Sequence, residues 1–90
     1  ATPHPLHRDH TLACLEGGKA VLCEKPFALN AREAAEMIDS ARARGLFLME
    51  AMWTYFLPAV TRLRELLASG VIGEVRLLQS NFCFRITWNP

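Results

Sequence analysis

Two short runs of apolar residues constrain the fold of this chain more than any other feature of its sequence. They occupy residues 20–23 and 46–49, and each follows a helix end that is marked by glycine. Neither run alternates apolar with polar residues, although a strand with one face in water would do so. Strands that are covered on both faces lose that alternation, so the two runs predict parallel strands with helices packed against them.

Three segments that flank these runs carry helical signals. We predict helices over residues 6–16, 30–45 and 58–69. In the middle segment, apolar residues recur at helical spacing while charged residues take the other face. Asn30 can cap its first turn with Glu33 three residues later, and Gly45 stands where a left-handed residue would end the helix. Helices and strands therefore alternate with short connections, as they do in βαβ units.

The last part of the chain has a different pattern. Residues 74–85 are rich in Val, Leu, Phe and Cys and predict one longer strand, while residues 87–90 do not look like a finishing element. We therefore expect an α/β fold in which residues 1–70 form the second half of a doubly wound parallel sheet. Residues 71–90 would begin a C-terminal α/β domain. So few parallel strands leave sheet edges uncovered, so we interpret the chain as a piece of a longer one.

Charge and composition narrow the classes of function. The 90 residues include 10 Lys and Arg against 9 Asp and Glu, mixed along the chain, and the net charge is +1. Such a balance gives no electrostatic footprint for nucleic acid or an anionic membrane, which leaves a small molecule or a protein as partner. No apolar run approaches the roughly 18 residues that cross a bilayer. An odd set of cysteines that matches no disulfide framework favours a reducing, cytoplasmic setting.

The strongest chemical signal is the run Glu24-Lys25-Pro26, which follows the first predicted strand. Ligands of open α/β sheets bind at the carboxyl edge of the strands, where this run is expected to lie. A lysine held at that edge can donate or accept a proton, or its ammonium can polarise a hydroxyl or carbonyl group. The plainer alternative is that Glu24 and Lys25 are ordinary solvated loop charges.

Two other groups of residues are candidates for ligand contacts. His4, His7 and His10 recur at intervals of three, but no pattern of a known zinc site accompanies them, so we predict no metal site. Instead, we expect His4 and His7 to line the same sheet edge as Lys25. Trp53 follows the second strand and is either a core residue or a flat apolar wall beside a ring-shaped or polyol substrate.

Three blocks of sequence together carry a resemblance to a known family. They are Thr2-Pro3-His4-Pro5-Leu6-His7, then Gly18-Lys19-Ala20-Val21-Leu22-Cys23-Glu24-Lys25-Pro26, and Leu48-Met49-Glu50-Ala51-Met52-Trp53. In this order and spacing they resemble the Gfo/Idh/MocA family of NAD(P)-dependent oxidoreductases, and most of all its dimeric dihydrodiol dehydrogenase branch. The resemblance spans nearly the whole chain, and its most specific part is the block that ends in Glu24-Lys25-Pro26.

The resemblance implies a Rossmann domain that binds NADP or NAD, followed by a C-terminal α/β domain through which such enzymes often form homodimers. It implies that Lys25 is the catalytic lysine, between the nicotinamide ribose and the reacting hydroxyl. His4 and Trp53 match positions that face the substrate. The cofactor-binding positions that it implies are Thr2, Pro3, His7, Glu24, Lys25 and Pro26. The implied reaction is hydride transfer between the nicotinamide and a secondary alcohol of a sugar, polyol or cyclic diol.

The sequence also departs from the pattern of that family. Tyr55 stands where the branch commonly has Arg, and the glycine fingerprint of dinucleotide-binding folds is not among these residues. Two other hypotheses stay open. One is a non-catalytic protein that binds the dinucleotide as a sensor or scaffold, against which the presence of Lys25 argues. The other is a small α/β interaction module without a cofactor.

Overall fold

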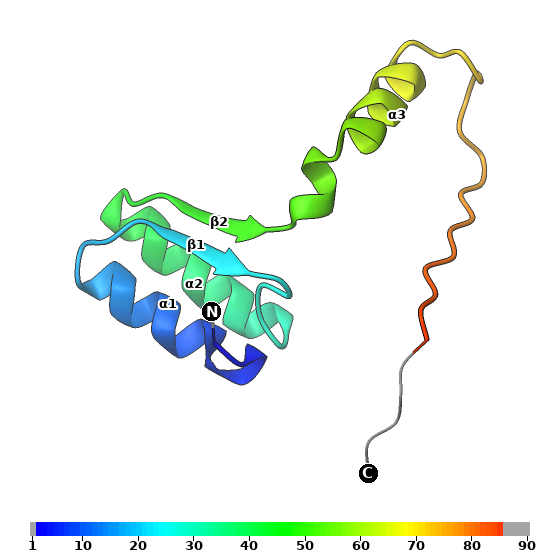
Figure 1. Ribbon diagram of the computed structural model, residues 1–90. Coiled ribbons are helices and arrows are strands. Elements are labelled where there is room, and N and C mark those ends of the chain that lie inside the picture. Colours follow the sequence, from blue (N-terminus) through cyan, green and yellow to red (C-terminus); the bar gives the residue numbers. More distant parts are fainter. Residues whose placement is uncertain (1, 86–90) are drawn as a thin grey trace. The chain divides into compact units, whose positions relative to one another are not determined.

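The computed structural model of the chain describes residues 2–85 (Figure 1). Its regular elements are α1 (His7–Glu16), β1 (Val21–Glu24), α2 (Ala31–Arg44), β2 (Leu48–Ala51) and α3 (Pro58–Ala68), with short 3₁₀ helices at His4–Leu6 and Trp53–Phe56. The chain divides into two compact units, Ala1–Leu57 and Pro58–Pro90. The expectation for residues 87–90 lies outside the described residues.

In the first unit, β1 and β2 are hydrogen-bonded as a parallel pair. Val21 pairs with Leu48 and Glu24 with Ala51, so the two strands end at the same edge. Helix α2 connects them, and α1 packs against both α2 and β1. The two helices lie on the same side of the strands in Figure 1. The predicted α/β class and the parallel βαβ arrangement are confirmed.

The strands begin later than the apolar runs predicted, and for β2 the preceding helix end accounts for part of the difference. Gly45 takes a left-handed φ of 63° after α2. The next residue, Leu46, donates its N–H to Ala41 O (3.0 Å), which satisfies one of the last carbonyls of the helix. Gly18 ends α1 in the same way. Because the N–H of Leu46 is used by the helix cap, this residue does not join the strand, and β2 starts at Leu48.

A small core lies between the helices and strands of the first unit. The buried apolar side chains among residues 2–85 are Leu15, Cys23, Met37 and Ala41. Two polar residues, His7 and Thr11, are buried as deeply, each with 3% of its surface exposed. Both come from α1. A polar group that loses contact with water needs a hydrogen-bond partner, so the environment of His7 is central to the site.

The second unit confirms one predicted element and corrects another. Helix α3 forms as expected, and none of its residues is buried. The strand predicted over residues 74–85 is wrong, because these residues form neither helix nor strand. A strand is stabilised by hydrogen bonds to a neighbour, and no strand in the described part of the chain pairs with this segment. The apolar composition of residues 74–85 favours a strand, but a strand also needs a neighbouring strand to pair with.

Three further expectations concern the chain as a whole. No helix within residues 2–85 is long and apolar enough to cross a membrane. All three cysteines are free thiols, with Cys23 buried and Cys14 and Cys83 exposed. The domain boundary predicted between residues 70 and 71 stays a prediction.

Candidate functional site

The predicted site residues gather where β1 and β2 end. Glu24 is the last residue of β1 and Lys25 follows it, and both are exposed. The backbone N–H of Lys25 donates to Glu24 Oε2 (3.1 Å), and the peptide bond between Lys25 and Pro26 is cis. The lysine therefore lies in the open at the carboxyl end of a parallel strand, the edge at which α/β folds bind their ligands.

The peptide group that joins Pro26 to Phe27 is held from two directions. Its carbonyl oxygen, Pro26 O, accepts a hydrogen bond from His7 Nδ1 (2.8 Å). Its N–H, on Phe27, donates to Glu50 Oε1 (2.8 Å). His7 comes from α1 and Glu50 from β2. Two elements outside the loop therefore each hold one polar atom of the same peptide group. The buried thiol of Cys23 adds a weaker contact, with Sγ 3.6 Å from Phe27 O.

The ring of His7 lies at the centre of the predicted site. Its second nitrogen, Nε2, is 3.2 Å from Thr2 O. Both partners are carbonyl oxygens, which only accept, so Nδ1 carries the N–H in the shorter bond to Pro26 O. The ring of His4 meets it edge to face, with centroids 5.4 Å apart. The structure thus brings Thr2, His4, His7 and Pro26 together, and His7 makes its contacts with the backbone of the protein itself.

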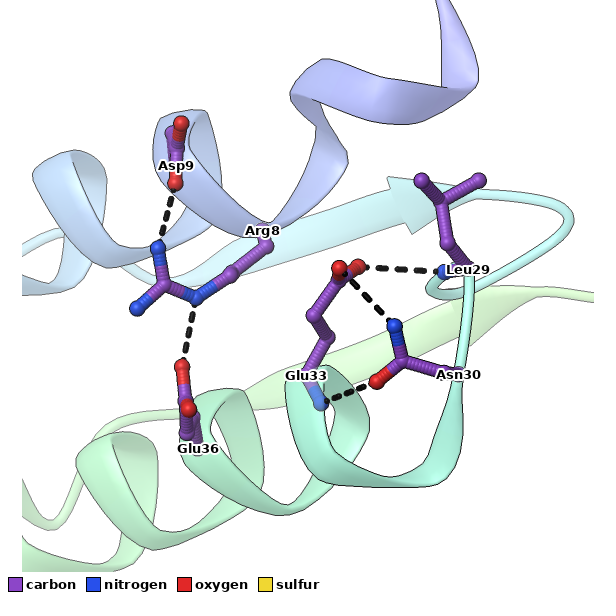
Figure 2. Close-up of polar contacts among 6 residues, drawn as sticks. All are labelled: Arg8, Asp9, Leu29, Asn30, Glu33 and Glu36. Atoms are coloured by element: carbon purple, nitrogen blue, oxygen red, sulfur yellow. Dashed lines mark hydrogen bonds and ion pairs between the residues drawn. The ribbon is translucent and has the colours of Figure 1, made fainter.

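Figure 2 shows how the loop after β1 is anchored where α2 begins. Asn30 Oδ1 accepts the N–H of Glu33 (3.0 Å), as the sequence predicted. Glu33 reaches back, and its carboxylate accepts from Asn30 Nδ2 (3.0 Å) and from the N–H of Leu29 (3.2 Å). In the usual capping box the carboxylate takes the N–H of the capping residue itself, so here the reciprocal bond is moved by one residue. The far end of the loop is therefore fixed to α2.

The two helices of the first unit are also joined at their surface, by Arg8 (Figure 2). Its Nε donates to Glu36 Oε2 (2.5 Å), and its Nη1 donates to Asp9 Oδ1 (2.7 Å). The hydrogen bond to Glu36, followed by the one to Asp9, raises the pKa of Arg8 above its usual value. All three side chains are partly exposed, so solvent screens the charges. The bridge links the helix that carries His7 to α2.

The segment after β2 presents aromatic side chains to solvent. Trp53 is 60% exposed, Phe56 is about as open, and Tyr55 is somewhat less exposed. The rings of Tyr55 and Phe56 meet edge to face, with centroids 5.3 Å apart. The indole of Trp53 is not in the core of this unit. Its role as a flat apolar wall beside a substrate stays a prediction.

The chemistry around this edge suits one end of a dinucleotide. A cavity of about 230 Å³ is lined by Thr2 and by residues of α1 and β1, among them Thr11 and Glu24. Its hydroxyl and carboxylate groups can bond a ribose, and the exposed ammonium of Lys25 follows directly. Within residues 2–85, no three His, Cys, Asp or Glu side chains gather closely enough to hold a metal ion.

Sequence analysis did not single out Glu50 as a functional residue. It is the third residue of β2, and it pairs in register with Cys23 of β1. The available signal was a carboxylate at the end of an otherwise apolar strand, where an unpartnered charge would be costly. The bond to the N–H of Phe27 explains why it is tolerated there.

A parallel βαβ unit with its polar groups at the carboxyl edge is the arrangement found in nucleotide-binding α/β proteins of the doubly wound class. Residues 1–52 match a family described as "Oxidoreductase family, NAD-binding Rossmann fold". The chain belongs to this Gfo/Idh/MocA family.

Curated relatives share a name. The chain is 57% identical over 81 residues to trans-1,2-dihydrobenzene-1,2-diol dehydrogenase of Sus scrofa, which covers 90% of the chain and 24% of that protein. It is 50% identical over 90 residues to the enzyme of the same name from Mus musculus, which covers 100% of the chain and 27% of that protein. The chain thus spans about a quarter of the length of these relatives.

Solved structures agree on the fold. An NAD binding oxidoreductase from Klebsiella pneumoniae matches with a TM-score of 0.75 and 38% identity, over 82% of this chain and 20% of that one. A 3-ketoreductase from Actinomadura kijaniata, in complex with TDP-benzene and NADP, matches with a TM-score of 0.71 and 38% identity, over 82% and 23%. Both support the Rossmann assignment that the sequence implied.

Proposed function

We propose that this chain supplies the second half of the Rossmann domain of an NAD(P)-dependent dehydrogenase that acts on the secondary alcohol of a cyclic diol or polyol. The observation that carries the proposal is the exposed Lys25 at the end of β1, in a loop whose next peptide group is held by two other elements. The named relatives are dehydrogenases of a dihydrodiol. We further propose a homodimer in the cytoplasm.

The roles of the site residues follow from their positions. Thr2, Pro3, Glu24 and Pro26 are exposed at the edge and would contact the nicotinamide end of the cofactor. His7 would contribute through the backbone that it holds, since its ring is buried. On the substrate side, the proposal assigns His4 and Trp53.

Lys25 is the proposed catalytic residue. When bound, the nicotinamide accepts or supplies the hydride. The amino group of Lys25 would lie against the reacting oxygen. As the neutral amine it would accept the hydroxyl proton while the hydride leaves during oxidation of the alcohol, and as the ammonium it would return that proton to the oxygen in the reverse reduction. The exposed indole of Trp53 would provide an apolar wall that orients the ring of the substrate.

The proposal is tested on the full-length protein in two measurements. The first titrates NADPH and NADH and follows binding by fluorescence or calorimetry. The second offers cyclic vicinal diols and polyols with either oxidised dinucleotide and follows the reduced form by absorbance. We expect binding of at least one dinucleotide and turnover of at least one cyclic diol. Absence of dinucleotide binding would contradict the assignment, and binding without turnover of any diol or polyol would indicate a sensor or scaffold.

A further inference from the structure

The unusual feature of the site is that one backbone peptide group is fixed at both of its polar atoms by side chains from elsewhere in the chain. Glu50, 23 residues further on, accepts its N–H, and His7, 19 residues earlier, donates to its oxygen. Each bond is 2.8 Å long. Loop peptides more often bond to water or to their near neighbours, so two distant side chains on one peptide fix its orientation strongly.

The held group lies next to the proposed catalytic lysine. Only Pro26 separates Lys25 from the held peptide, and its ring fixes φ at about −65°. Between the held peptide plane and the Cα of Lys25, the ψ of Pro26 is then the one soft backbone torsion that remains. Orientation of the peptide is in this way passed on to the direction in which the Lys25 side chain leaves the backbone.

The side chains of His7 and Glu50 are themselves held in place, so they can fix the orientation of the Pro26–Phe27 peptide. The ring of His7 is 3% exposed and is bounded on its other side by Thr2 O (3.2 Å). Glu50 is half-buried within β2, and its backbone is fixed by pairing with β1. A carboxylate that accepts from an N–H makes a stronger bond than a neutral acceptor. Neither side chain needs to reach the substrate in order to matter for the reaction.

We propose that Glu50 and His7 are positioning residues that hold the Pro26–Phe27 peptide and thereby fix where the ammonium of Lys25 meets the reacting oxygen. This inference rests on the proposed function, because it assumes that Lys25 is catalytic. It adds a residue, Glu50, that sequence analysis had not assigned to the site, and it gives His7 a support role in place of direct contact with the cofactor.

The test compares variants of Glu50 in the full-length protein. Glu50→Ala removes the acceptor, and we expect kcat to fall by about 10- to 100-fold, the size of effect that a displacement of roughly 1 Å can cause. The Kd of the dinucleotide should stay within about threefold, because the bond between Glu50 and the Phe27 N–H is proposed to position Lys25 and not to bind the cofactor. Glu50→Gln keeps an oxygen in reach of the Phe27 N–H and should recover most of the lost rate. Asp39→Asn, on the exposed face of α2, serves as the control and should leave kcat unchanged.

A double variant separates positioning from a general structural role. If Glu50 acts through Lys25, then adding Glu50→Ala to Lys25→Ala should lower kcat by less than about threefold further. A full additional loss would contradict the inference, as would a single Glu50→Ala variant with normal kcat. If Lys25→Ala itself has normal kcat, the proposed function fails instead, so the two failures are distinguishable.

Variants of His7 test the other side of the peptide. The amide of Asn takes nearly the place of Nδ1, so His7→Asn can still donate to Pro26 O, whereas His7→Ala cannot. We expect kcat to fall at least about tenfold more in the alanine variant than in the asparagine variant. Equal kcat in the two variants would overturn the role of His7. If Glu50→Ala does not fold, Glu50→Asp is used, because its shorter side chain withdraws the acceptor and should give the same loss of kcat.

Discussion

The two segments that follow the parallel strands reach the same edge of the molecule but are held in different ways. After β1, the peptide next to Lys25 is bonded to side chains of α1 and β2. After β2, the backbone bonds of residues 52–57 run within the segment, from Tyr55 N–H to Met52 O (3.1 Å) and from Leu57 N–H to Thr54 O (3.3 Å). The sequence separation is therefore large for the bonds that hold the first segment and small for the backbone bonds of the second.

The difference matches the work proposed for each segment. A group that transfers a proton must meet one atom at one distance, and an error of about 1 Å is costly. A wall that packs against an apolar ring tolerates small movements, because dispersion and hydrophobic contact depend weakly on direction. We therefore expect changes at the first segment to lower the rate, and changes at the second to weaken substrate binding.

The largest expected effect is that of removing the lysine. Lys25→Ala in the full-length protein should lower kcat and kcat/KM together by about 10² to 10⁴, the range for a positioned acid or base. Lys25→Arg should not restore the rate, since guanidinium keeps the charge but does not give up a proton. Steady-state kinetics on an accepted diol measures both, and a Lys25→Ala rate within about threefold of the original would remove the proposed role.

A smaller effect, and of a different kind, is expected on the other segment. Trp53→Ala should raise KM for the diol by about tenfold, as loss of one apolar wall predicts, with little change in kcat. Phe47 is equally exposed, at 61% against 60%, but lies at the opposite end of β2, so Phe47→Ala is the matched control. If kcat fell and KM did not, the contrast between the two segments would break down.

The third prediction concerns the anchor at the end of the loop after β1. Asn30→Ala removes the cap of α2 and should destabilise the protein by about 1 kcal/mol without changing the Kd of the dinucleotide. Asn30→Ser retains an acceptor for the Glu33 N–H without placing a second carboxylate beside Glu33, and should restore most of the melting temperature. Thermal denaturation of the three proteins decides the matter, and a Tm for Asn30→Ala equal to the original would show that the cap adds nothing.

The smallest expected effect is at the surface bridge between the helices. Arg8→Gln should lower Tm slightly, and the difference should vanish in about 1 M salt, where the screening length is only about 3 Å. The raised pKa of Arg8 means that its charge contributes at every pH below its usual value and is lost only as pH rises through the raised value. Deprotonation of Arg8 should therefore cause no change in Tm across the neutral range. A difference in Tm that persisted in high salt would indicate lost packing and not lost charge.

Local signals explain which parts of the fold could be predicted from the sequence. The cap at Asn30 and the left-handed Gly45 depend on residues within one or two turns, and both form as predicted. The strand predicted over residues 74–85 needed a pairing partner, which composition cannot supply. The same limit applied to the start of β2, where a bond from Leu46 to the preceding helix was not visible in the apolar run.

In the site, too, one part could be predicted from local sequence signals and another could not. The place of Lys25 followed from a general rule about the carboxyl ends of parallel strands, and it lies there. The bonds from His7 and Glu50 join residues that are 19 and 23 positions from their partners. They depend on how α1 packs and on the register of the two strands, and a local sequence pattern predicts neither. A buried polar residue reveals its partner only after the chain is folded.

The pairing of β1 with β2 has an evolutionary consequence. Cys23 lies opposite Glu50, and a shift of one residue would turn that carboxylate to the other face of the sheet. The connection that follows Gly45 sets this register, since β2 begins three residues later at Leu48. Such a connection can accept many substitutions but few insertions or deletions. Loop length, more than loop sequence, is thus the property to compare when homologous genes are screened for enzymes that hold their lysine in this way.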